Sequence, residues 1–251
     1  MNPFKLSPGL KGNVAGLRGL AVILIVFFHL DFPFFHGVFF GVDIFLVISG
    51  YLVTRLLVRE FEENRAKGGF GWISIRLFYF KRARRLLPPS LVLSIAVLTY
   101  SFFNQNKFEF LKNLGDFWWT VFCASNINFY VQSVDYFNHG AAPSVFLHYW
   151  SLSLQEQFYA VWPLLFLLAV SMNAMSFRGR LVGWKSRLLV VAIFLTAASL
   201  AWMLVDFYRN SSEVYFSLAT RAWEIGAGAI CALLPNSRPN KTASNLLGLV
   251  G

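Results

Sequence analysis

The chain has 251 residues, of which 57% are hydrophobic and 14% are charged, and its formal net charge is +10. A soluble domain of this length would carry about 25% charged residues, so the composition excludes an ordinary soluble protein and favours lipid as the solvent. In a membrane protein an excess of Lys and Arg usually lies on cytoplasmic loops, so we expect a lipid bilayer and no nucleic acid as partner.

Seven apolar segments follow one another, each near the length of about 20 residues that crosses a bilayer as a helix. We predict spans at 18–35, 38–57, 86–103, 150–171, 188–206, 220–235 and from 243 onward. The fold class is therefore all-α, a polytopic transmembrane helix bundle with about seven spans. Because the chain stops at Gly251 inside the last predicted span, we interpret 1–251 as the N-terminal part of a longer membrane domain.

Most of the 22 Lys and Arg lie before the first span or in every second loop after it. The positive-inside rule then places the N-terminus in the cytoplasm and the protein, as a multi-pass protein, in the cell (inner, or cytoplasmic) membrane. If 116–130 were an eighth span, Arg178 and Arg187 would lie outside. We therefore predict that 116–130 is a re-entrant or interfacial helix on the outer face.

Polar residues interrupt the first two predicted spans. Arg18 and His29 are separated by roughly 16 Å along a helix, which places Arg18 at the cytoplasmic boundary and His29 well inside the membrane. His29 either bonds to a neighbouring helix or acts as a general base, a task for which histidine is suited near neutral pH. Asp43 is able to orient that imidazole, bind a cation, or lie at the interface as an ordinary acid.

Two arginines lie at the cytoplasmic end of the third span. Arg82 and Arg85 are three residues apart, so they share one face of a helix. Two guanidinium groups on one face suit a phosphate-rich ligand, because each can bind a phosphate through two hydrogen bonds. Contact with anionic lipid headgroups is the competing interpretation.

The segment 146–166 is rich in polar and aromatic residues at the outer boundary of the fourth span. Trp150, with Tyr149 and Trp162, is either part of an aromatic belt or part of a site that also contains Ser151 and Tyr159. Glu156 enters the span, so its carboxyl group must be paired or protonated. Further along the chain, the three-residue spacing of Arg221 and Glu224 allows an ion pair within one helix.

Several common catalytic motifs are missing from the sequence. It has no G-x-S-x-G elbow, no P-loop, no H-E-x-x-H and no His/Cys cluster with the spacing of metal ligands. We therefore expect no metal and no bound cofactor.

Five segments in a fixed order are similar to the membrane acyltransferase-3 family. They read "LRGLAVILIVFFH", "GVDIFLVISGYLVT", "YFKRARRLLP", "HYWSLSLQEQFY" and "TRAWEIGAGA", and together they cover nearly the whole chain. The first contains the family's Arg, ten residues and His, here Arg18 and His29, and the third contains its Arg-x-x-Arg, here Arg82 and Arg85. Where the family usually has two adjacent acids, this chain has Gln155 and Glu156. The family domain also has more helices than this chain supplies.

The resemblance implies an O-acyltransferase that modifies cell-surface polysaccharide, lipopolysaccharide or peptidoglycan. It implies that His29 is catalytic, with Asp43 or Glu156 holding the imidazole or the acceptor, and that the arginines bind the donor. The donor would be cytoplasmic acyl-CoA, with acetyl-CoA as co-substrate, and the acceptor an extracytoplasmic glycan hydroxyl. Acceptor or structural support would come from a set of five residues, which are Trp150, Ser151, Tyr159, Arg221 and Glu224.

Two other functional classes remain open at this stage. Intramembrane His, Asp and Glu can form a proton relay, so a proton-coupled secondary transporter is the alternative function, although the two halves of the chain show no convincing repeat. A membrane scaffold without catalytic activity is the third interpretation. Transfer of an acyl group would identify an enzyme, and proton-coupled flux would identify a transporter. A scaffold would show neither activity.

Overall fold

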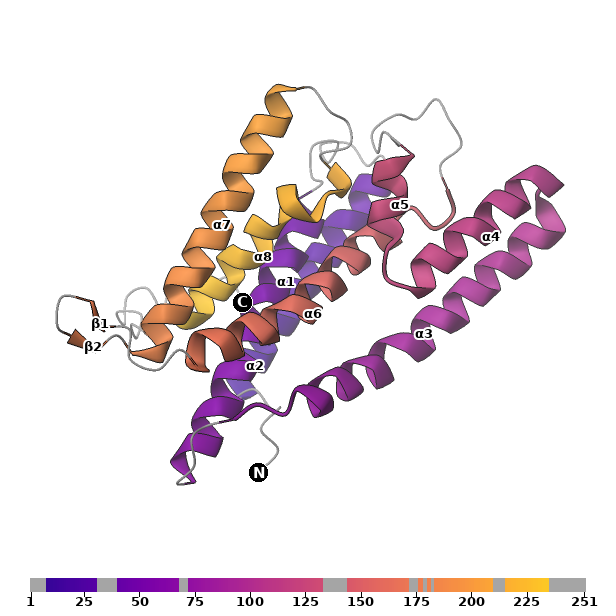
Figure 1. Ribbon diagram of the computed structural model, residues 1–251. Helices are drawn as coiled ribbons and strands as arrows, with labels where there is room; N and C mark the ends of the chain where they lie inside the picture. Colours follow the sequence, from indigo (N-terminus) through magenta and orange to yellow (C-terminus); the bar gives the residue numbers. More distant parts are fainter. Residues whose placement is uncertain are drawn as a thin grey trace. The chain divides into compact units, whose positions relative to one another are not determined.

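The computed structural model describes residues 8–30, 40–67, 72–132, 144–171, 176–177, 180–181, 183–209 and 215–234. In these ranges the chain forms eight α-helices and one pair of two-residue strands (Figure 1). The helices are α1 (Pro8–His29), α2 (Gly41–Ala66), α3 (Ile75–Asn104), α4 (Lys107–Val121), α5 (Ser125–Val131), α6 (Tyr149–Ser171), α7 (Trp184–Tyr208) and α8 (Leu218–Leu233). The strands β1 (Ser176–Phe177) and β2 (Arg180–Leu181) are antiparallel.

The all-α prediction is confirmed, and most predicted spans correspond to helices with shifted ends. Three helices are long and apolar enough to cross a membrane, namely α2, α3 and α7, while the apolar part of α1 is the shorter Val14–His29. The first helix begins at Pro8 and ends at His29, whereas we predicted 18–35. Proline suits the first turn of a helix, where its missing N–H costs nothing. The segment from 243 lies outside the described residues, so the number of spans stays a prediction.

The chain divides into two compact units, which are described here one at a time. The first unit comprises 1–71, 172–193 and 224–251, and the second comprises 72–171 and 194–223. The first therefore contains α1 and α2 with parts of α7 and α8. The second contains α3 to α6 with the remaining parts of α7 and α8.

In the first unit, α1 and α2 pack as an antiparallel pair. A Cβ atom at Gly41 would lie 2.5 Å from Ile25 Cγ1 and 2.8 Å from the carbonyl oxygen of Ala21, so the start of α2 touches the second half of α1. Further along both helices, the Arg18 guanidinium lies 5.7 Å from the centre of the Phe45 ring. Because the two helices are antiparallel, the last turn of α1 and the first turn of α2 lie at the same end of the pair.

Glycine brings the backbone of α8 against that of α2 within the same unit. A Cβ atom at Gly50 would overlap the carbonyl group of Ile225, and one at Gly228 would overlap the carbonyl oxygen of Val47. Small residues of this kind allow membrane helices to approach closely and gain dispersion contacts where the hydrophobic effect gives no help. The "GAGA" sequence of α8 therefore serves helix packing.

In the second unit, α4 turns back alongside α3 (Figure 1). The turn is defined by a capping box, in which the Asn106 side chain accepts a hydrogen bond from the Glu109 backbone and the Glu109 carboxylate accepts one from Asn106 N–H. Inside the hairpin the buried Asn113 amide donates to Ser101 Oγ at 3.0 Å and to Gln105 Oε1 at 2.7 Å. Caps and buried amides satisfy polar groups that lipid would leave without a partner.

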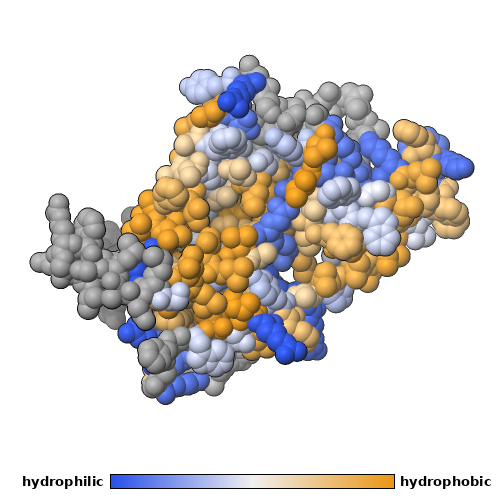
Figure 2. Space-filling view, in the orientation of Figure 1, coloured by the Kyte–Doolittle hydropathy of each residue, from blue (hydrophilic) through white to orange (hydrophobic). Residues whose placement is uncertain are grey.

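Helix α4 has its polar face inside and its apolar face outside. Its buried residues are Asn113, Asp116 and Thr120. Its exposed side chains include Phe108, Leu111, Trp118 and Trp119, and Phe122 follows directly after the helix. Apolar side chains cover much of the visible surface of the α3–α4 hairpin in Figure 2. This is the reverse of a helix on a water-soluble protein, and it fits a helix whose outer face meets lipid.

The segment 116–130 is interrupted and does not form one continuous helix. Helix α4 ends at Val121 and α5 begins at Ser125, with Cys123 between them at a φ of 53°. A residue with a side chain rarely adopts this left-handed conformation, which marks a sharp turn. An uninterrupted eighth span through 116–130 is therefore excluded, and its location on the outer face stays a prediction.

Candidate active site

In the second unit, Arg82 of α3 and Glu156 of α6 form an ion pair. Arg82 Nε donates to Glu156 Oε2 at 3.3 Å, and Arg82 Nη2 donates to the other carboxylate oxygen of Glu156. The Arg82 side chain is 30% exposed and that of Glu156 is 16% exposed. We predicted that Glu156 must be paired or protonated, and it is paired. The Arg82 guanidinium group binds both oxygens of its carboxylate.

Two tyrosines support this ion pair. The Arg82 guanidinium lies over the ring of the buried Tyr159 at 3.6 Å from the ring centre, an arrangement in which the ring face attracts the cation. One turn earlier on α3, Tyr79 donates a hydrogen bond of 2.6 Å to the carbonyl oxygen of Ala160. Tyr159 thus fixes the plane of the guanidinium, and Tyr79 fixes α3 against α6 beside it.

The same two helices meet again through Tyr149. Its hydroxyl group lies 3.2 Å from Ser94 Oγ and 3.3 Å from the carbonyl oxygen of Ser90. Residues later in α3 therefore contact residues earlier in α6, so the two helices are antiparallel. Arg85 lies one turn beyond Arg82 on α3 and is exposed.

A pair of amide side chains holds the break between α4 and α5 against α6. Gln157 Nε2 donates to the carbonyl oxygen of Cys123 at 3.0 Å and to Asn126 Oδ1 at 2.7 Å. Asn126 Nδ2 donates in return to Gln157 Oε1 at 3.3 Å and to the carbonyl oxygen of Phe216 at 3.2 Å. Because Gln157 follows Glu156 directly, the helix turn that carries the ion pair is also the turn that binds this break.

Further buried hydrogen bonds join α4 to α5 and to the segment before α6, and one more joins α5 to α6. Asp116 accepts hydrogen bonds from Asn128 Nδ2 at 2.7 Å and from Ser144 Oγ at 2.6 Å. Ser125 N–H donates to Ser153 Oγ at 3.2 Å. Sequence reasoning missed these residues, although polar amides and hydroxyls inside an otherwise apolar segment are a signal of buried hydrogen bonding.

Trp150 is a buried part of an aromatic cluster and does not belong to an aromatic belt. It is 1% exposed, and its ring centre lies 4.6 Å from that of Tyr215 and 5.9 Å from that of Phe216. The Arg221 guanidinium lies 5.6 Å from the Trp150 ring centre and 4.9 Å from that of Tyr215. The belt interpretation of Trp150 is therefore wrong, while Arg221 and Trp150 do lie together.

Two predicted support residues remain, Ser151 and Glu224. Ser151 is half-buried in the first turn of α6, where its hydroxyl donates to the carbonyl oxygen of His148 at 3.3 Å. Glu224 is 1% exposed and belongs to the first unit.

His29 is the last residue of α1, in the first unit. Its Nδ1 lies 2.8 Å from the carbonyl oxygen of Ile25. A carbonyl oxygen only accepts hydrogen bonds, so Nδ1 carries the proton in the neutral ring and Nε2 carries the lone pair. Asp43 is half-buried in the first turn of α2, at the same end of the α1–α2 pair, and Arg18 lies three turns back on α1.

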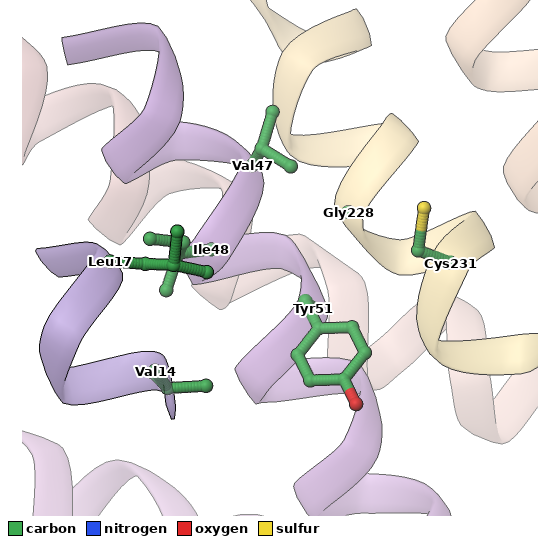
Figure 3. Close-up of a pocket in the computed structure, with 7 residues that line it drawn as sticks. All are labelled: Val14, Leu17, Val47, Ile48, Tyr51, Gly228 and Cys231. Carbon is green, nitrogen blue, oxygen red and sulfur yellow. The ribbon is translucent and has the colours of Figure 1, made fainter. Parts of the chain in front are cut away.

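A pocket of about 240 Å³ lies between α1, α2 and α8 in the first unit (Figure 3). The residues that line it are Val14, Leu17, Val47, Ile48, Tyr51, Gly228 and Cys231. Apart from the tyrosine hydroxyl and the cysteine thiol, their side chains offer only apolar surface. The predicted site residues are not among them.

Comparisons with known proteins agree with the family that the motifs resemble. The family model described as "Acyltransferase domain" matches residues 12–251. The chain is similar to Peptidoglycan O-acetyltransferase OatA of Listeria monocytogenes, with 36% identity over 224 residues, which are 88% of this chain and 33% of that protein. It is similar to O-acetyltransferase OatA of Staphylococcus aureus, with 32% identity over 231 residues, 91% of this chain and 35% of that protein.

The chain spans about a third of the length of these curated relatives. No solved structure matches it. The family match extends over nearly all of the sequence, from within the second turn of α1 onward, and its range contains each of the five motifs. The chain therefore belongs to the membrane acyltransferase-3 family.

Proposed function

We propose that this chain transfers an acyl group, acetyl in the first instance, from acyl-CoA to a hydroxyl group of an extracytoplasmic glycan. Two of its relatives are named Peptidoglycan O-acetyltransferase OatA and O-acetyltransferase OatA, so peptidoglycan is the acceptor we propose first. The observation that carries the proposal is the hydrogen bond from His29 Nδ1 to Ile25, because it leaves Nε2 as the basic nitrogen.

In this reaction His29 is the general base. Nε2 takes the proton of the acceptor hydroxyl as its oxygen attacks the thioester carbonyl carbon. The new C–O ester bond forms, the C–S bond breaks, and the CoA thiolate leaves with the proton that the imidazolium returns. Asp43, at the same end of the α1–α2 pair as His29, is the acid that we propose to stabilise the imidazolium or hold the acceptor.

Arginines serve the donor in this proposal. CoA carries phosphates, and guanidinium groups bind phosphate through two parallel hydrogen bonds. We place the CoA phosphates at Arg82 and Arg85 of the second unit. That Arg18 of the first unit also serves the donor stays a prediction. CoA is a cytoplasmic metabolite, so this placement requires the cytoplasmic N-terminus that the distribution of Lys and Arg favours.

The test is the base-labile acetate content of peptidoglycan from cells that carry the full-length gene. Four strains are compared: wild type, His29→Ala, His148→Ala and a strain without the gene. Removing a general base costs about 10²- to 10⁴-fold in rate, so we expect His29→Ala to equal the strain without the gene. His148, an exposed histidine in the other unit, is the control for a histidine-to-alanine change.

Membrane levels of each variant are matched by immunoblot before acetate is compared. Acetate that is retained in His29→Ala at wild-type level overturns the role of His29. Acetate that is unchanged in the strain without the gene overturns peptidoglycan as the acceptor. Proton-coupled flux is then the next measurement.

A further inference from the structure

The guanidinium group at which we propose the donor to bind already holds an anion in this structure. The Nε and Nη2 edge of Arg82 is occupied by both oxygens of Glu156. This is the edge of the guanidinium that also fits two oxygens of a phosphate group, since carboxylate and phosphate present similar pairs of acceptors. Two anions on one edge are excluded by geometry, and like charges at this separation repel one another in a half-buried site.

We propose that Glu156 is an internal ligand of Arg82 that a donor phosphate displaces when acyl-CoA binds. The inference rests on the proposed function, because it takes the donor to bind at Arg82. Glu156 is a positioning residue in this scheme. Its carboxylate compensates the charge of Arg82 while no acyl-CoA is bound. It competes with the acyl-CoA phosphate for the same two N–H groups of Arg82.

The surroundings of Arg82 suit such an exchange. Tyr159 supports the guanidinium from its face at 3.6 Å, and this contact uses none of the N–H groups. The contact therefore holds Arg82 in place whichever anion occupies its edge. The side chain of Arg82 is 30% exposed, so a ligand can reach it without opening the packed core.

Arg85 provides a second cation for the incoming group. It lies one turn beyond Arg82 on α3 and is exposed. A phosphate group that binds at Arg82 interacts with both arginines. The Glu156 carboxylate, which projects from α6, binds Arg82. Donor binding is consequently favoured by the pair of arginines and opposed by one carboxylate.

The experiment measures binding of coenzyme A to the purified full chain in lipid nanodiscs by isothermal titration calorimetry. Glu156→Gln keeps the shape of the side chain but removes the competing charge. We expect the Kd for CoA to fall by about 5- to 10-fold, because the phosphate no longer has to break a half-buried, charge-assisted pair of hydrogen bonds. Glu63→Gln is the matched control, because Glu63 pairs with Arg59 at 2.6 Å on α2, in the other unit.

Two further arms identify the cause of the change. In an Arg82→Ala background, Glu156→Gln is expected to leave the Kd for CoA unchanged, since the competition takes place on Arg82. Pantetheine, which lacks the phosphates of CoA, is expected to bind wild type and Glu156→Gln equally.

The outcomes separate this inference from the function on which it rests. If wild type and Arg82→Ala bind CoA equally, donor binding at Arg82 is wrong and the proposed function loses its donor site. If Arg82→Ala weakens binding but Glu156→Gln also weakens it or leaves it unchanged, Glu156 orients Arg82 and the competition is overturned. A tighter complex with CoA and not with pantetheine supports the competition.

Discussion

The contact between α2 and α8 and the contact between α4–α5 and α6 are built by opposite means. At the first, Gly50 and Gly228 let backbones touch, and the pocket beside them is almost wholly apolar. At the second, Asp116, Asn126 and Gln157 join the elements through buried side-chain hydrogen bonds. Lipid gives no hydrophobic drive to either contact, so close packing and hydrogen bonding are the two means that remain.

The two contacts also differ in what a substitution removes. A glycine contact depends on the absence of atoms, so any added side chain forces the helices apart. A hydrogen-bonded contact depends on particular partners, so a substitution leaves specific donors and acceptors without bonds. The glycine contact is therefore expected to be the more sensitive of the two to small changes.

The largest effect is expected for Gly228→Ala. The new Cβ atom would overlap the carbonyl oxygen of Val47 and lie 2.8 Å from Tyr51 N, so α8 must move away from α2. Overpacking of this kind costs about 3 kcal/mol. The measurement is thermal unfolding in detergent by fluorescence-detected size exclusion. Gly115→Ala on α4, which meets open space, is the control and is expected to keep the wild-type melting temperature.

A smaller loss is expected for Asp116→Ala. It leaves Asn128 Nδ2 and Ser144 Oγ without their acceptor, which costs about 1–2 kcal/mol inside a membrane protein. The same unfolding measurement checks this value. The double variant with Asn128→Ala should lose less stability than the sum of the two single variants, and strict additivity would show that the bond between them contributes nothing.

The smallest effect is expected for Tyr149→Phe. The ring stays in its packing position while the hydroxyl loses its bonds to Ser94 and Ser90 on α3. Interhelical hydrogen bonds in membranes are worth about 0.6 kcal/mol on average, so the melting temperature should fall by only a few degrees. A loss as large as that of Gly228→Ala would mean that the hydroxyl groups, and not the packing, hold α3 against α6.

Helix positions were predictable because lipid imposes length and composition on every helix that crosses it. The helix ends were less so: α1 begins at Pro8, ten residues before the predicted start, and α3 begins at Ile75, eleven residues early. The α3 extension and residues 8–13 of α1 are polar enough to lie outside the hydrocarbon, where hydropathy no longer reports on helix formation.

The candidate site was predictable residue by residue but not in its contacts. Glu156 was expected to need a partner, yet Arg82 lies 74 residues away, and no local pattern indicates the register of two helices so far apart in sequence. The hydrogen bond from His29 to Ile25 spans four residues and follows from the helix end alone. The belt interpretation of Trp150 failed because a boundary tryptophan looks the same in sequence whether it faces lipid or the protein interior.

The inside-out helix α4 has a consequence for the order in which the protein is made. Both partners of the Asp116 carboxylate, Asn128 and Ser144, are synthesised after it, as is Ser153, which binds the turn that follows α4. Chains emerge from the ribosome N-terminus first, so α4 exists for a time with the Asp116 carboxylate lacking both of its hydrogen-bond donors, a state that hydrocarbon does not tolerate. We expect α4 to wait in contact with water or the insertion machinery until α6 has been made, and to enter the membrane only as part of a unit with α5 and α6.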